Sequence, residues 1–78
     1  MAKIRKFEVG ARAVKAPQSE VDAFVQTVSG EDGELFLYLY NYSQRGPEVG
    51  GSPTQSLHFD AESAKRFKQI LEQTFGPL

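Results

Sequence analysis

Hydrophobic side chains recur at every second position in several short stretches of this chain. The clearest stretch begins at Leu35 and reads "LFLYLYNY", with leucines and aromatic residues in alternation. Its aromatic members are Phe36, Tyr38, Tyr40 and Tyr42. Because successive side chains of a strand point to opposite faces, the pattern predicts a strand over 34–43 with one aliphatic and one aromatic face. Water alone rarely covers four aromatic residues in a row, so the aromatic side needs a protein layer or a ligand.

Three further stretches have the composition of strands: residues 4–15, 21–28 and 55–59. The segment "SGEDGE" before the aromatic strand contains two glycines and an Asp-Gly step, which predicts a hairpin loop. Both faces of 21–28 are apolar, so the pattern leaves the orientation of this strand open. Residues 44–54, "QRGPEVGGSPT", predict a long flexible loop at one end of the sheet.

The C-terminal part of the chain predicts one amphipathic helix over 61–75. Asp60 is a suitable N-cap, and Gly76 and Pro77 are typical of a helix end. The stripe that this helix buries contains Ala64, Phe67, Leu71 and Thr74, and Ile70 and Phe75 widen it.

These elements predict an α+β fold: a four-stranded antiparallel sheet followed by one C-terminal helix packed on one face (ββββα), in a single domain over 1–78. We expect the helix to cover the aliphatic face, which would contain Leu35, Leu37, Leu39, Leu57, Phe59, Phe7 and Val9. The opposite face would then lack an intramolecular cover and would contain Phe36, Tyr38, Tyr40, Tyr42, His58, Lys6 and Arg12.

Composition restricts how such a small domain is stabilised and where it acts. The 78 residues include no cysteine, so a disulfide and a thiolate metal site are both excluded. Association is then a common way for a small domain to gain buried area, and we expect a homodimer. The sequence has neither a long apolar run nor the apolar core of a signal peptide, which predicts a cytoplasmic protein without membrane contact.

The sequence does not indicate enzymatic chemistry. Its single histidine, His58, is more typical of a strand surface than of a catalytic or zinc site. "GGSPT" lacks the lysine of a phosphate-binding loop, and "EDGE" is too short for an EF-hand. We therefore expect no catalytic residues, metal, cofactor or small-molecule substrate.

The aromatic face admits three interpretations. The first is a surface for single-stranded DNA or RNA, on which rings stack with bases and basic residues meet phosphates. It also fits a protein interface, including a homodimer, because tyrosine and phenylalanine are enriched in interface cores. Finally, tyrosines are good strand formers that partly cover each other. The candidate nucleic-acid-binding residues are Lys3, Lys6, Arg12, Lys15, Phe36, Tyr38, Tyr40, Tyr42, Arg45 and His58.

Charge is distributed unevenly along the chain. The formal net charge is −1, yet the first 15 residues carry five basic residues and one acidic one. A basic first strand beside an aromatic sheet favours nucleic acid, whereas the overall acidity argues against strong, indiscriminate binding of polyanions.

The order of elements also resembles a known group of proteins. The stretch from "GELFLYLYNY" to "SLHFDAESAKRFKQILEQTF" resembles the PC4-like and PUR-type single-stranded nucleic-acid-binding modules. This resemblance implies a curved four-stranded sheet before a helix, pairing of two modules, and single-strand binding on the sheet and loops. By location, Tyr38, Tyr40 and Lys6 or Arg12 match the binding positions. The departure is charge, because such binders are usually more basic.

From the aromatic face, the basic first strand and this resemblance, the expected function is single-stranded nucleic-acid binding with weak sequence preference, in transcription or nucleic-acid regulation. The alternative is a homodimeric interaction or assembly module that uses the aromatic face.

Overall fold

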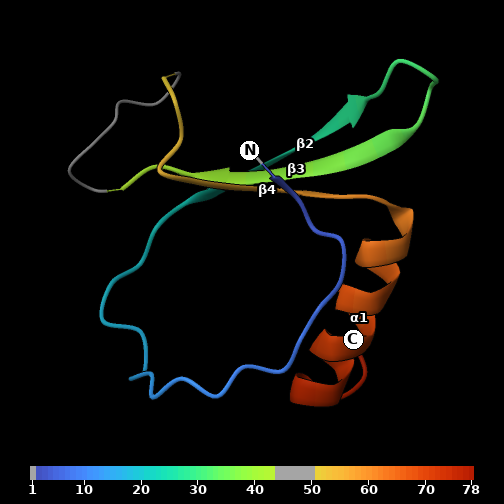
Figure 1. Ribbon diagram of the computed structural model, residues 1–78. Helices are drawn as coiled ribbons and strands as arrows, with labels where there is room; N and C mark the ends of the chain where they lie inside the picture. The colour runs from blue at the N-terminus through green and yellow to red at the C-terminus, as the bar shows by residue number, and fades with distance from the viewer. Residues whose placement is uncertain (1, 44–50) are drawn as a thin grey trace.

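The chain folds into one sheet with a single helix at its end (Figure 1). The computed structural model describes residues 2–43 and 51–78. Its elements are β1 (Ala2–Lys3), β2 (Ala23–Ser29), β3 (Leu35–Asn41), β4 (Gln55–Phe59) and α1 (Ala61–Phe75). The strands lie in the order β1-β4-β3-β2. The α+β class and the sequence of four strands and one helix are as predicted, whereas the sheet is mixed and not purely antiparallel.

The first strand is the main correction. Only Ala2 and Lys3 form β1, and they pair parallel with Leu57 and His58 of β4. β1 and β4 therefore run in the same direction, and β4 ends at Phe59, one residue after the partner of Lys3. Beyond Ile4, whose N–H donates to the His58 carbonyl at 2.9 Å, this segment pairs with no strand of the described residues. The predicted strand over 4–15 is therefore wrong, and residues 4–22 form an arm without regular secondary structure.

The hairpin between β2 and β3 is confirmed. Its pairing runs from Ala23–Asn41 to Ser29–Leu35. The Gly30 N–H donates to the Glu34 carbonyl at 2.7 Å, and the Gly33 N–H donates to the Gly30 carbonyl at 3.1 Å. Gly33 has a φ of 83°, which a glycine adopts without steric cost. This is a three-residue hairpin loop with glycine at its left-handed position.

The helix begins and ends where the sequence predicts. Asp60 caps its N-terminus: the Ser63 backbone N–H donates to Asp60 Oδ1 at 2.8 Å, and the Asp60 N–H donates to Ser63 Oγ at 3.0 Å. This reciprocal pair satisfies two backbone donors at the helix start. At the other end, the Gly76 N–H donates to the Glu72 carbonyl at 2.8 Å.

The core is a stack of three phenylalanine rings. Phe59 of β4 lies 5.2 Å from Phe67 of α1, and Phe67 lies 5.6 Å from Phe7 of the arm, measured between ring centroids. Phe59 is 4% exposed and is the one buried hydrophobic residue among the described residues. The stack fastens both α1 and the arm to the same side of the sheet, as Figure 1 shows.

The aliphatic face is less covered than the sequence predicts. Leu35 is 61% exposed, and Leu37 and Leu57 are each 42% exposed. Val9, expected on the same face, lies in the arm and is fully exposed. The expectation that the helix covers these leucines is wrong, because α1 packs mainly against β4 and leads away from the sheet (Figure 1). Among the described residues, no helix has the length and apolar character to cross a membrane.

Candidate nucleic-acid interface

The predicted aromatic face exists, and it lies opposite α1. In the sheet register, Phe24 of β2 pairs with Tyr40 of β3, and Tyr38 of β3 pairs with His58 of β4. Directly paired residues share a face, so these four rings lie together. The name "aromatic face" is used below for the surface formed by Phe24, Phe36, Tyr38, Tyr40, Tyr42 and His58. The register also fixes the orientation of β2, which the sequence pattern left open.

The rings form a continuous row across three strands. Phe24 and Tyr40 stack at 5.3 Å, Tyr40 and Tyr38 at 4.8 Å, and Tyr38 and His58 at 4.5 Å, with interplanar angles of 16°, 22° and 24°. Phe36 meets His58 edge-on, 6.3 Å away. Each of these rings is consequently half-buried, mostly by its neighbours, and keeps part of its surface open.

Two tyrosine hydroxyls are tied to polar groups. The Tyr40 hydroxyl donates to Gln26 Oε1 at 3.1 Å, and the Tyr42 hydroxyl donates to the Gly51 carbonyl at 3.1 Å. Tyr42 also meets Phe24 edge-on at 5.8 Å. These bonds orient the rings, so the face is preorganised for a flat or apolar ligand.

The basic candidates are mostly separated from this face. Lys3 pairs with His58 in the sheet, which places it beside the row. Lys6 is in the arm, where its Nζ lies 3.2 Å from Glu8 Oε1. Arg12 and Lys15 lie further along the arm and are exposed, and Figure 1 shows the arm on the helix side of the sheet. The structure thus brings together the predicted rings, His58 and Lys3, but not Lys6, Arg12 or Lys15. Arg45 lies outside the described residues, as do residues 44–50 of the predicted loop.

Lys3, the cation that the sheet register places beside the rings, is itself paired. Lys3 Nζ lies 3.2 Å from Asp60 Oδ2. Hydrogen bonds from the Ser63 backbone and side chain, followed by Lys3, lower the pKa of Asp60 from 3.8 to about 2. Asp60 is therefore a carboxylate at neutral pH, and it offsets the positive charge of Lys3 at this edge of the face.

Sequence reasoning missed two members of the site, Phe24 and Gln26. The alternation of β2 alone could not place them, since both of its faces are apolar. The loop length could have done so. A three-residue loop closed by Gly30 and Glu34 sets the register of the hairpin, and this register puts Phe24 opposite Tyr40.

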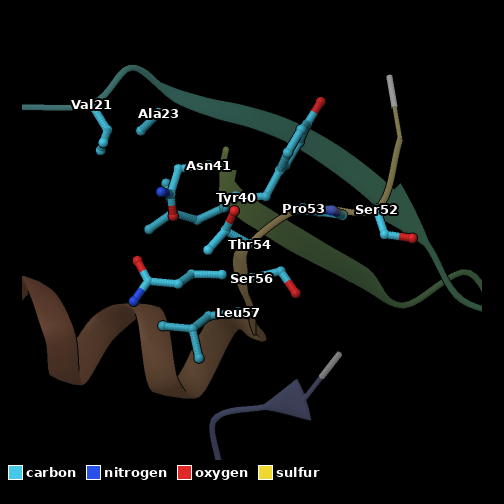
Figure 2. A pocket seen from close by; sticks show the side chains of 11 residues that line it. Val21, Ala23, Tyr40, Asn41, Ser52, Pro53, Thr54, Ser56 and Leu57 are labelled. Carbon is cyan, nitrogen blue, oxygen red and sulfur yellow. The ribbon is translucent and has the colours of Figure 1, made fainter. Parts of the chain in front are cut away.

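A wide groove lies at the end of the sheet where β3 ends and β4 begins. Its volume is about 950 Å³. The lining includes Val21, Ala23, Leu39, Pro53 and Leu57, and no described residue in it is charged. The register places Ala23, Leu39 and Leu57 on the aliphatic face of the sheet, and Figure 2 shows the Tyr40 ring directed away from Leu57. The groove therefore belongs to the aliphatic side of the sheet and suits an apolar partner better than a phosphate.

Comparison with known proteins does not assign this site. No family model, curated protein or solved structure matches the chain. Within the described part of the chain, no group of three or more His, Cys, Asp or Glu residues is placed to hold a metal ion.

Proposed function

We propose that this protein binds single-stranded DNA or RNA, with weak sequence preference, on the aromatic face. The observation that supports the proposal is the continuous row of four stacked rings, from Phe24 to His58, with part of each ring open. Stacking of a base on an aromatic side chain contributes about 1–3 kcal/mol and tolerates any base, because every base has a π-face. The resemblance to PC4-like and PUR-type modules is part of this proposal, as are a cytoplasmic location and a role in nucleic-acid regulation.

The positions of the basic residues predict how strongly salt should weaken binding. Each phosphate contact on a single strand contributes about −0.7 to the slope of log K against log salt. If Lys3 alone meets a phosphate, the slope is about −0.7. If Lys6, Arg12 and Lys15 of the arm also reach the strand, the slope approaches about −3. We expect the shallow slope, because the arm follows the other side of the sheet.

The experiment is fluorescence anisotropy with a labelled oligothymidylate and a labelled oligouridylate, at several salt concentrations. Combined replacement of Tyr38 and Tyr40 by alanine should weaken binding at least tenfold. The matched control replaces Val9 and Val14 by alanine, since both are exposed and lie in the arm. No binding by the folded protein at micromolar concentration and low salt would refute the proposal.

A second candidate is an interaction or assembly module that uses the aromatic face as a protein interface, including a homodimer. The observation that favours it is the small charge of this face, where Lys3 is offset by Asp60. Interface cores are rich in tyrosine and phenylalanine and poor in charged residues. The same double alanine variant distinguishes the two. A loss of self-association in sedimentation, without oligonucleotide binding by the unsubstituted protein, would favour the module.

A further inference from the structure

The molecule exposes more surface than a folded chain of its size. Its accessible surface is 6933 Å² for a mass of 8.7 kDa, whereas the scaling for folded monomers gives about 4,700 Å². Its Cα radius of gyration is 14.5 Å, compared with about 11.5 Å for a compact domain of this length. The excess, on the order of 2,000 Å², exceeds the roughly 800 Å² that each partner buries in a standard interface.

Four of the nine large hydrophobic residues that are exposed among the described residues lie on the side of the sheet that faces α1: Val25, Leu35, Leu37 and Leu57. The register places Val25, Leu39 and Leu57 in one row, and Thr27, Leu37 and Phe59 in the next. The name "leucine face" is used below for the surface formed by these residues together with Leu35. Val25 and Leu35 are 64% and 61% exposed. The three strands that carry this face contain no Asp, Glu, Lys or Arg.

Intramolecular packing leaves this face open. The first turn of α1 lies beside it, but a depression of about 260 Å³ separates Ala64 from Leu35 and Leu37. Farther along, α1 leads away from the sheet (Figure 1), and Phe75 near its end is 71% exposed. The helix stripe and the leucine face are therefore two apolar surfaces of one chain that meet at Phe59 and Phe67, whose rings stack at 5.2 Å.

We propose that a second copy of this chain covers the leucine face, in a two-fold contact that also uses the apolar stripe of α1. Because the three strands of the leucine face carry no charged residue, this face can meet its own copy without repulsion, and a two-fold contact uses the same patch on both chains. Three strands of five to seven residues present roughly 300 Å² in the plane of the sheet, and a helix of fifteen residues adds roughly 200 Å². Two copies thus supply about 1,000 Å² in footprint, which reaches the size of a specific interface.

The partner is a second copy because the need for cover is permanent. Over residues 2–43 and 51–78, Phe59 is the one buried hydrophobic residue, so little apolar burial offsets the conformational entropy of the chain. Obligate homodimers gain the missing burial at their interface, and their folded monomers are often not stable alone. The contact does not depend on the proposed nucleic-acid binding. It uses the opposite side of the sheet and leaves the aromatic face accessible.

The first experiment is sedimentation equilibrium of the full chain. We expect a dimer at micromolar concentration. Replacing Val25 and Leu35 by glutamate places a charge at two exposed positions of the face and should raise the dissociation constant roughly 100-fold or more. The matched control replaces Val9 and Val14, which lie in the arm and are 101% and 79% exposed, by glutamate. This control variant should dimerise as the unsubstituted chain does. A folded monomer at about 100 μM, or equal loss in both variants, would overturn the proposal.

A second measurement does not depend on the stability of the charged variant. The chain has no cysteine, so single cysteines can be introduced cleanly. Thr27 and Gln26 are neighbours on β2, are both exposed and lie on opposite faces of the sheet. With a thiol cross-linker of about 10 Å, the spacing of packed sheets, Thr27→Cys should give a covalent dimer and Gln26→Cys should not. Equal yields, or a higher yield at Gln26→Cys, would refute the leucine face as the contact.

Discussion

The phenylalanine stack makes a specific prediction about stability. Phe67 lies between Phe59 and Phe7, so its ring links α1 to β4 on one side and to the arm on the other. Replacing Phe67 by alanine removes both contacts at once. No other described side chain joins these three parts of the chain through two stacked rings.

The magnitude follows from burial and stacking. Truncating a fully buried phenylalanine to alanine costs about 3–5 kcal/mol, and Phe67 is only partly buried, so roughly half of this applies. Each stacked pair adds about 0.5–1.5 kcal/mol. We expect Phe67→Ala to lower the free energy of unfolding by about 2.5–5.5 kcal/mol, of which burial gives roughly 1.5–2.5 kcal/mol and the two stacked pairs give roughly 1–3 kcal/mol. For a domain of this size, this corresponds to a fall in Tm of at least about 10 °C.

The assay is urea and thermal unfolding followed by circular dichroism, at one fixed protein concentration because association contributes to stability. Phe67→Leu keeps an apolar side chain without the ring and should lose about half as much. Lys68→Ala, at the neighbouring exposed position, should change stability by less than about 0.5 kcal/mol. A change for Phe67→Ala as small as that of Lys68→Ala would refute the assignment of the stack as the core.

Three further predictions concern Asp60, Gly33 and the arm. Because folding lowers the pKa of Asp60 from 3.8 to about 2, its carboxylate stabilises the fold fully above about pH 4, and this contribution is lost as the pH falls through about 2. Asparagine at this position can still cap the helix. The Tm of Asp60→Asn should therefore fall less than the Tm of the unsubstituted protein between about pH 5 and pH 2. Equal falls in Tm, measured by thermal unfolding at each pH, would contradict this. Gly33→Ala should lower the free energy of unfolding by about 1 kcal/mol, because Gly33 has a φ of 83°. Gly10→Ala, where a Cβ would meet open space, should not lower it. Equal effects of the two substitutions in denaturant titrations would argue against the turn geometry. Trypsin should cut first after Arg12 or Lys15, which are exposed and outside regular secondary structure, and mass spectrometry showing first cleavage within α1 would exclude this arrangement.

The helix, the hairpin and β4 could be predicted because their signals are local. Asp60 and Gly76 determine where α1 begins and ends through hydrogen bonds within a few residues of themselves. The hairpin loop depends on a glycine that can adopt a positive φ at Gly33. Alternation within β3 was sufficient to group Phe36, Tyr38 and Tyr40 on one face.

The remainder required contacts between distant segments. The direction of β1 depends on its pairing with β4, more than fifty residues away, and this pairing leaves residues 4–22 without a strand partner. For that reason Lys6 and Arg12, expected beside the rings, lie in the arm. The sequence by itself thus determined the ends of α1, the hairpin loop and the aromatic side of β3, since each of these depends on residues that are close together in the chain. Only the tertiary structure decided that Phe24 joins the row of rings and that the leucines stay exposed, because both depend on strand register and on the angle at which α1 leaves the sheet.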